Sequence, residues 1–217
     1  MKKMGDEKQI IHEGIVYRFS SDWIHKLEAE EHWRLYWRQQ NLMQDRIHVR
    51  DSILEIGVGS GFTANYLRAK GFFVTTVDID KEKKPDIVAN IVSFDPKQVF
   101  DHILAFEVFE HFPFEKFVQV VEKLSEYCRM YLFISVPQYK RVLASIECRF
   151  PKIGKRAFTL TIPKNKLTEH HHYWELGYQG INDRKIVNIL SNYGFRLEHS
   201  EEAFCRSFFA FRRINPL

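Results

Sequence analysis

The glycine-rich stretch at residues 53–62 constrains the fold of this chain more than any other part of the sequence. Residues 53–56 are apolar except for one glutamate, and this run predicts a short buried β-strand. Three glycines follow at alternate positions, Gly57, Gly59 and Gly61. Glycine is expected here because a loop that turns tightly against a ligand leaves no room for a Cβ atom.

The residues after this loop predict a helix and a second strand. Residues 62–70 have a helical pattern that ends at Gly71, and residues 72–78 form an apolar run that ends in Asp78. This acid follows the loop by about 20 residues, where a carboxylate can accept hydrogen bonds from ribose hydroxyls. The order of strand, glycine loop, helix and acid-terminated strand is typical of a nucleotide-binding βαβ unit.

The spacing of the glycines excludes two common nucleotide-binding motifs. The dinucleotide fingerprint needs a third glycine where this chain has Phe62, and the Walker pattern needs a Gly-Lys-Ser/Thr that is absent. Glu55 stands two positions before the first glycine, and the resulting Glu-x-Gly-x-Gly-x-Gly resembles motif I of the class I S-adenosylmethionine-dependent methyltransferases. The strand, the spacing and the second acid favour this resemblance over a glycine turn in an unrelated α/β protein.

Predicted strands continue to alternate with helices further along the chain. Strands are predicted over residues 86–92, 100–106 and 130–136, and an amphipathic helix over residues 115–128. Such alternation indicates an α/β fold with a doubly wound, mostly parallel sheet, which binds ligands at the carboxyl ends of its strands. Those ends carry Glu55, Asp78, Asn90, Phe106 and Glu107. We therefore expect four loops to converge on one cleft.

The resemblance extends this fold prediction to the C-terminus. A helix is expected over residues 181–193, followed by strands over residues 195–200 and 203–212. In the resembled family, two such strands form the antiparallel C-terminal hairpin of a seven-stranded, Rossmann-like sheet. The resemblance covers roughly residues 50–212 and is strongest over residues 53–136.

The resemblance also implies a cofactor, S-adenosylmethionine, and a set of residues that bind it. The acid and glycines of the loop are expected to hold the methionine part, and Asp78 the ribose. Ile79, Asn90 and Ile91 are expected to flank the adenine. The family usually has aspartate at position 90, but an asparagine oxygen can still accept a hydrogen bond from the adenine amine. The predicted cofactor set is Glu55, Gly57, Gly59, Gly61, Asp78, Ile79, Asn90, Ile91 and Phe106.

Methyl transfer requires that the acceptor is held in line and that its proton is removed if it is a hydroxyl or a protonated amine. The cofactor that the resemblance implies carries the activated carbon, so the protein mainly has to orient the acceptor and supply a base. Candidate catalytic residues are Glu107 and His111 after the fourth strand, and His172 in a later histidine cluster. Histidine suits this task because its pKa lies near neutral pH.

A metal site is an open alternative at the same place. Glu107-x-x-Glu110-His111 could bind a divalent ion, with His170, His171 or His172 as a fourth ligand. A similar sequence binds metal in small-RNA 2′-O-methyltransferases. Related sequences without a known metal are also widespread in the superfamily, where they cap a helix and line the cofactor pocket. Whether this chain binds a metal is therefore unknown from the sequence.

Two regions fall outside the sheet pattern. Residues 1–50 are expected to form an N-terminal arm and helical lid, with a short strand within 10–19 and a helix over 22–45; the methyltransferase domain then covers 51–217. The helix places Trp33, Tyr36, Trp37 and Gln40 on one face, either packed on the sheet or covering the cofactor. Residues 138–172 read as a substrate-side insertion with a short helix and a strand, and its basic residues fit a solvated loop, an anion or membrane-surface patch, or a dimer contact.

Composition sets limits on location and partners. The 217 residues suffice for one domain with a full core, and the net charge of +4 does not require nucleic acid as a partner. Cys128, Cys148 and Cys205 are scattered, which fits a reducing cytoplasm. The N-terminus lacks a signal-peptide core, and no apolar run approaches membrane-spanning length. Oligomeric state is unknown.

These patterns together predict an S-adenosylmethionine-dependent methyltransferase that acts on an unidentified small or medium-sized acceptor. The first alternative is a metal-assisted RNA 2′-O-methyltransferase, although the chain shows neither a strong positive charge nor an added RNA-binding domain. The second alternative is a non-catalytic module that binds S-adenosylmethionine as a structural ligand. The abundance of candidate bases near the cleft favours the enzyme.

Overall fold

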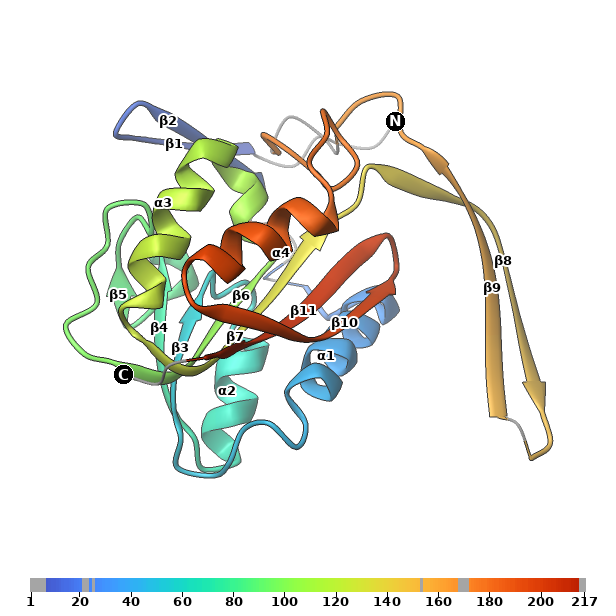
Figure 1. The fold of residues 1–217 in the computed structure, drawn as a ribbon, viewed down its shortest axis with the longest axis horizontal. Coiled ribbons are helices and arrows are strands. Elements are labelled where there is room, and N and C mark those ends of the chain that lie inside the picture. The colour runs from blue at the N-terminus through green and yellow to red at the C-terminus, as the bar shows by residue number, and fades with distance from the viewer. Residues whose placement is uncertain (1–6, 21–23, 25, 153, 168–171, 215–217) are drawn as a thin grey trace.

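The computed structural model describes residues 7–20, 24, 26–152, 154–167 and 172–214. Within this part of the chain, the central sheet contains the strands β3 (Ser52–Ile56), β4 (Phe73–Asp78), β5 (Ile87–Val88), β6 (Phe100–Phe106), β7 (Cys128–Pro137), β10 (Phe195–Ala203) and β11 (Arg206–Arg213). Their order is β10-β11-β7-β6-β3-β4-β5 (Figure 1).

Neighbours from β5 to β7 are parallel, whereas β11 runs antiparallel to β7 and to β10. The seven-stranded, mostly parallel sheet with an antiparallel C-terminal hairpin is thus confirmed.

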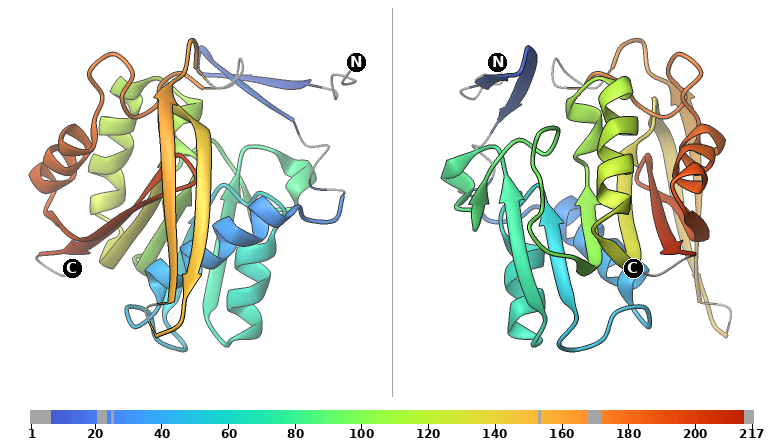
Figure 2. Two further views of the ribbon diagram at one scale, coloured as in Figure 1. Left: turned by 90° about the vertical axis from the view of Figure 1, so that its right-hand side faces the viewer. Right: turned by 60° about the vertical axis from the view of Figure 1, so that its left-hand side comes forward.

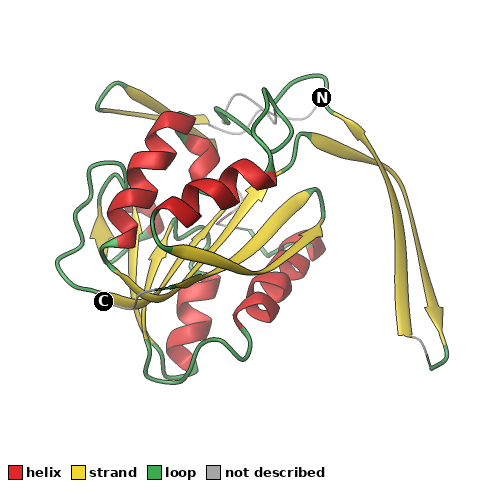
Figure 3. Ribbon diagram, in the orientation of Figure 1, coloured by secondary structure: helices red, strands yellow, loops and turns green. Residues whose placement is uncertain are grey.

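Helices cover both faces of this sheet (Figure 3). The helices α1 (Glu30–Met43) and α2 (Phe62–Ala69) lie on one face, and α3 (Phe114–Ser125) and α4 (Asp183–Asn192) on the other. Alternate residues of β3 point to opposite layers: Ile53 packs with the α1 and α2 side chains, and Leu54 with those of α3 and α4. A strand buried on both faces explains why residues 53–56 are almost uniformly apolar.

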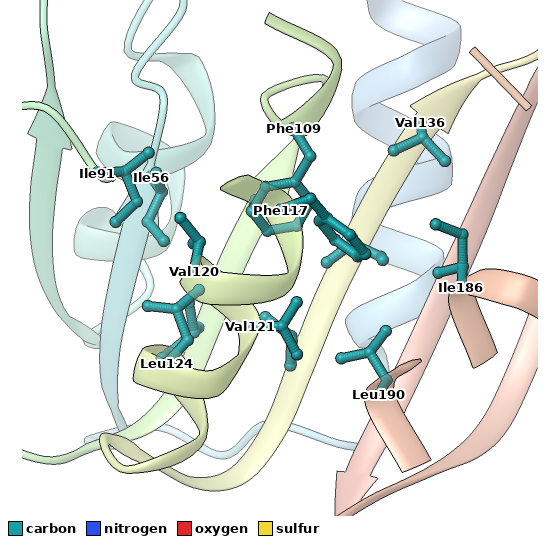
Figure 4. Close-up of a cluster of buried hydrophobic side chains, with 14 of the residues drawn as sticks. Ile56, Ile91, Phe109, Phe117, Val120, Val121, Leu124, Val136, Ile186 and Leu190 are labelled. Atoms are coloured by element: carbon teal, nitrogen blue, oxygen red, sulfur yellow. The ribbon is translucent and has the colours of Figure 1, made fainter. Parts of the chain in front are cut away.

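The core on the α3 side depends on the helical spacing of apolar residues (Figure 4). The α3 side chains at positions 117, 120, 121 and 124 are fully buried, as are Ile186 and Leu190 of α4. The N-terminus of α4 is fixed by Asn182, whose side-chain oxygen accepts a hydrogen bond of 2.9 Å from the Lys185 backbone N–H. These two helices therefore bury one face of the sheet.

Several expected boundaries need correction. The strand expected over residues 86–92 is reduced to the two residues of β5, because the chain turns into the cavity wall at Asn90. The helix α1 begins at Glu30, so residues 26–29 are not helical, while residues 22, 23 and 25 lie outside the described part. The prediction that Trp33 and Trp37 pack on the sheet is wrong, because both residues are more than half exposed.

The N-terminal arm contains a hairpin, not a single strand. Its strands β1 (Glu7–His12) and β2 (Ile15–Ser20) pair antiparallel, with Ile10 opposite Tyr17. Ile15 and Tyr17 are buried and join the core on the α3 side. The hairpin thus closes one end of the domain, a role that needs contacts between residues far apart in the sequence.

The insertion contains a long hairpin in place of the expected helix and strand. It consists of β8 (Lys140–Phe150) and β9 (Gly154–Pro163), which pair antiparallel. Figure 1 shows the two strands projecting from the body, and the left view of Figure 2, taken from that side, shows them in front of it. No helix in the described residues is long and apolar enough to span a membrane.

Candidate active site

A cavity of about 730 Å³ lies at the carboxyl ends of β3, β4 and β6. Its wall contains eight of the nine residues of the predicted cofactor set: Glu55, Gly57, Gly59, Asp78, Ile79, Asn90, Ile91 and Phe106. The three catalytic candidates Glu107, His111 and His172 line the same cavity. Gly61 does not line it; this glycine is the N-cap residue of α2, with a left-handed φ of 79°.

The first glycine of the loop is required by close packing. Gly57 has a φ of 79°, and a Cβ atom there would lie 2.6 Å from Cγ2 of Val108. The backbone N–H of Gly57 donates to the Val77 carbonyl at 2.8 Å, which ties the loop to the end of β4. A side chain at this position would therefore push apart the two loops that form the floor of the cavity.

Asp78 is held rigidly at the end of β4. Its Oδ2 accepts a hydrogen bond of 2.9 Å from the Val58 backbone N–H, and its Oδ1 accepts one of 2.8 Å from the Asp80 backbone N–H. Lys83, from the short 3-10 helix η2 (Lys81–Lys83), places Nζ 3.1 Å from Oδ2. The carboxylate thus links the glycine loop to a lysine that also lines the cavity and lies over the Phe19 ring.

Glu55 is buried beneath the glycine loop, on the side of the sheet that faces α2. Burial raises its pKa to about 8, and the nearby Asp78 adds to the rise, while Arg68 and the Ala64 backbone N–H oppose it. Its Oε2 has no hydrogen-bond partner among the described residues. A cationic ligand group beside this oxygen would satisfy it and favour the charged carboxylate.

The N-terminal hairpin supplies a wall that the sequence did not predict. The hydroxyl of Tyr17 donates to Oδ1 of Asn90 at 2.9 Å, and burial raises the pKa of Tyr17 to about 12. The Val92 backbone N–H donates to the same oxygen at 3.0 Å. Asn90 is therefore fixed by both neighbours, with the apolar side chain of Ile91 next to it in the cavity wall.

The helix α1 contributes to the opposite wall. Tyr36 lines the cavity, stacks on Phe62 at a ring-centroid distance of 4.4 Å, and shares a hydrogen bond of 2.8 Å with Ser60 of the glycine loop. Of the four residues expected on one face, Tyr36 is the one in the cavity wall; the part of this helix that approaches the loop also contributes Gln39. This arrangement agrees with a helix that covers the cavity.

Glu107 is positioned by a strained backbone and two partners. Its φ is 55°, a left-handed value that is uncommon for a non-glycine residue. Oε1 accepts a hydrogen bond of 2.8 Å from the Ser135 hydroxyl, and Oε2 accepts one of 2.7 Å from Nε of Arg206. Arg206 begins β11, 99 residues later in the chain, so no local sequence signal indicated this ion pair.

Glu110 and two histidines form a compact cluster beside Glu107. Glu110 and His111 lie on the 3-10 helix η3 (Phe109–His111), and His172 comes from the loop before α4. One ligand atom from each of the three residues lies within 4.8 Å of the others. Glu110 is fully buried, and neither of its carboxylate oxygens has a hydrogen-bond partner among the described residues.

Burial, and then the neighbouring carboxylate of Glu107, raises the pKa of Glu110 well above its ordinary value. A carboxyl group in this position is stable when it holds a proton or when it binds a cation. Of the three candidates for a fourth metal ligand, His172 lies in this cluster, whereas His170 and His171 fall outside the described residues.

His172 is oriented by a buried carboxylate. Its Nδ1 lies 2.8 Å from Oε1 of Glu175, and Oε2 of Glu175 accepts a hydrogen bond of 2.7 Å from Nζ of Lys164. The backbone N–H of Tyr173 donates to the Glu110 carbonyl at 2.8 Å, so this loop is attached directly to η3. Because Nδ1 is engaged by Glu175, Nε2 is the ring nitrogen left for a ligand or a proton in the cavity.

The fold agrees with comparisons to known proteins. A family model described as a methyltransferase domain matches residues 21–200, and the chain belongs to this family of methyltransferases. No curated protein matches the sequence.

Solved structures share the fold at low sequence identity. One is the magnesium protoporphyrin IX methyltransferase of Synechocystis PCC 6803 with bound S-adenosylmethionine, at 16% identity and a TM-score of 0.55, covering 84% of this chain and 79% of that one. Another is an N-methyltransferase of Bradyrhizobium japonicum WM9 in complex with S-adenosylhomocysteine, at 11% identity and a TM-score of 0.57, covering 87% and 90%. A sugar N-methyltransferase of Streptoalloteichus sp. ATCC 53650 matches at 15% identity and a TM-score of 0.53, covering 87% and 94%.

Proposed function

We propose that the chain binds S-adenosylmethionine in the cavity and transfers its methyl group to a small-molecule acceptor. The observation that carries this proposal is the convergence of four strand-end loops, with Glu55, Asp78, Asn90 and Glu107, on one cavity of about 730 Å³. A volume of this size is ordinary for a small-molecule site. Two of the solved structures contain S-adenosylmethionine or its product, and their acceptors include a porphyrin, which supports a small-molecule acceptor here.

The residues present fit this cofactor. Its ammonium and sulfonium groups are cationic, and the cavity wall contains the carboxylates of Glu55 and Asp78. The oxygen of Glu55 that has no hydrogen-bond partner among the described residues is complementary to a cationic group, and Gly57 and Gly59 line the cavity beside it. Asp78 is then assigned to the ribose, and Ile79, Asn90 and Ile91 to the adenine. When bound, the cofactor supplies the activated methyl carbon.

The acceptor is assigned to the other end of the cavity, where Glu107, His111 and His172 lie. Nε2 of His172 takes the acceptor proton in this scheme, and Glu175 holds the ring in place from the far side. Glu107 is already paired with Arg206, so it positions the acceptor through that pair instead of acting as a free base. In this proposal, residues 1–50 cover the cofactor and residues 51–217 form the methyltransferase domain. The scattered cysteines support a cytoplasmic location.

Thermal unfolding with S-adenosylmethionine, S-adenosylhomocysteine and NAD, compared side by side, tests the cofactor. A ligand that binds only the folded state raises the unfolding midpoint by mass action. We expect both adenosyl-sulfur ligands to raise it and NAD to leave it unchanged. A shift with NAD alone, or with none of the three, contradicts the assignment. Turnover with a panel of small acceptors then separates an enzyme from a binding module.

A second candidate is a metal-assisted methyltransferase, favoured by the buried carboxylate of Glu110, which lies beside two imidazoles and has no hydrogen-bond partner among the described residues. Two histidines and one carboxylate match the ligands that zinc and manganese accept. Bound metal would lower the pKa of an acceptor hydroxyl, so that water could take its proton without a side-chain base. Addition of Zn²⁺ or Mn²⁺ to chelator-treated protein should raise the unfolding midpoint, and Glu110→Gln should abolish that rise. An unchanged midpoint contradicts the metal site and leaves the base mechanism.

A further inference from the structure

The β8–β9 hairpin has two chemically different faces. In its register, Ile146 lies opposite Phe158 and Ala144 opposite Leu160. The intervening pair is Ser145 and Thr159, whose hydroxyl oxygens are 3.2 Å apart. Because successive side chains of a strand point to opposite faces, the apolar pairs share one face and the hydroxyl pair lies on the other.

The apolar face is exposed in the structure. The exposed fractions are 64% for Ile146, 69% for Phe158 and 58% for Leu160. A two-stranded hairpin is marginally stable in water by itself, and Figure 1 shows this one projecting from the domain. An exposed apolar face on a projecting element indicates a surface that another component covers.

The net charge of residues 138–166 indicates what kind of component covers the apolar face. Residues 138–166 contain eight lysines and arginines and one acidic residue, Glu147, for a net charge of +7. Because the whole chain carries +4, the remainder of the chain carries −3. The positive charge of the protein is therefore concentrated in the same segment that exposes the apolar face.

We propose that this hairpin docks on an anionic lipid surface. The apolar pair Ile146 and Phe158 would enter the boundary between head groups and acyl chains, and the basic residues of the segment that do not line the cavity would meet the anionic head groups. Long basic side chains suit this boundary, because their stems lie on apolar surface while the charges reach the head groups. Residues 140–163, which form the hairpin, contain six lysines and arginines and one acid, for a net charge of +5. Pairing with the hairpin of a second copy would instead bring two segments of +5 together, which is electrostatically unfavourable.

The roots of the hairpin connect this surface to the active site. Lys140 at the start of β8 and Lys164 just after β9 both line the cavity. Docking of the hairpin would therefore bring the acceptor end of the cavity toward the lipid surface. The proposal does not depend on which acceptor the cavity takes.

Flotation of the full chain with lipid vesicles tests this inference. We expect the protein to float with phosphatidylcholine vesicles that contain about 30% phosphatidylglycerol, and not with phosphatidylcholine alone. Added salt of about 0.5 M should weaken binding, because it screens the basic segment. The double variant Ile146→Gln with Phe158→Gln should reduce the bound fraction roughly tenfold or more, since two large apolar side chains no longer enter the boundary.

A matched control uses the opposite face of the same strands. Ser145→Gln with Thr159→Gln changes neighbouring positions, and it should bind anionic vesicles as the unmodified chain does. Equal thermal midpoints of the two double variants would show that both are folded. The inference is overturned if the chain does not float with anionic vesicles, or if both double variants bind equally. It is also overturned if sedimentation shows a dimer that the Ile146 and Phe158 changes convert to monomer, because a second copy then covers this face.

Discussion

Nδ1 of His172 lies 2.8 Å from Oε1 of Glu175, a carboxylate with no solvent exposure. The other carboxylate oxygen contacts Nζ of Lys164 at 2.7 Å, so one buried acid holds two cationic or polar partners. We expect Glu175→Ala to lower the free energy of unfolding by about 3 kcal/mol, because it removes the buried carboxylate that His172 and Lys164 both contact. Chemical denaturation measures this change. Glu126→Ala, at an exposed position, is the control and should change the free energy by less than about 0.5 kcal/mol; an equal effect at both positions would contradict the role of Glu175.

The buried Glu55 predicts an unusual dependence of stability on pH. Its pKa is about 8 in the folded chain and 4.5 ordinarily, so between these values the unfolded chain loses a proton that the folded chain keeps. This contribution to stability is complete below the ordinary pKa and is lost as the pH rises toward 8. In the ligand-free protein, Glu55→Gln should gain stability relative to the unmodified chain, by on the order of 1 kcal/mol per pH unit in this window.

Denaturation curves at several pH values measure the Glu55 effect, and the difference between variant and unmodified protein removes the contribution of other groups. The same Glu55→Gln variant should bind S-adenosylmethionine more weakly, since it lacks the negative charge. A difference that stays constant from pH 5 to pH 8 would falsify the assignment of a raised pKa to Glu55.

A side chain at Gly57 would destabilise the fold in two ways, through the left-handed backbone and through a clash with Val108. Gly57→Ala places a Cβ atom 2.6 Å from Val108 Cγ2 at a φ of 79°, whereas Gly180→Ala meets nothing within 4 Å at a φ of 76°. Gly180→Ala therefore measures the backbone cost alone, about 1 kcal/mol. We expect Gly57→Ala to cost more than this and to weaken cofactor binding, as thermal unfolding and calorimetry can show. Adding Val108→Ala should recover part of the stability, and no recovery would argue against the close approach.

The position of Asp78 in the cavity wall predicts that its substitution weakens cofactor binding. We expect Asp78→Asn to weaken S-adenosylmethionine binding by roughly tenfold or more, because a neutral amide replaces the carboxylate assigned to the ribose. Titration calorimetry measures this affinity. Asp95→Asn changes an acid that lies outside the cavity wall and should leave the affinity unchanged. Equal affinities for Asp78→Asn and the unmodified chain would remove Asp78 from the ribose site.

The sheet could be predicted from the sequence because its signals are local. Residues 53–78 carry a buried strand, a glycine loop and a capped helix within 26 positions, and each signal depends on neighbours in the chain. The end of each strand then located Glu55, Asp78, Asn90 and Glu107, and all four line one cavity in the structure.

Other parts of the site depend on contacts between distant residues. Tyr17 meets Asn90 across 73 positions, and Arg206 meets Glu107 across 99, so neither pair leaves a pattern in a short window. The β8–β9 hairpin was missed for a different reason. Its apolar residues are exposed, and many basic residues lie among them in the sequence. The segment therefore lacks the clear apolar pattern of a buried strand, and its composition is typical of a solvated loop.

The hydroxyl of Tyr173 accepts a hydrogen bond of 3.1 Å from the Val16 backbone N–H and donates one of 3.0 Å to the Val16 carbonyl. These bonds join the N-terminal hairpin, which closes the Asn90 end of the cavity, to the loop that carries His172. A shift of the hairpin that accompanies cofactor binding would therefore also move the loop that carries His172, where the acceptor is assigned. Thermodynamic linkage makes such an effect reciprocal: the factor by which cofactor changes acceptor affinity equals the factor by which acceptor changes cofactor affinity.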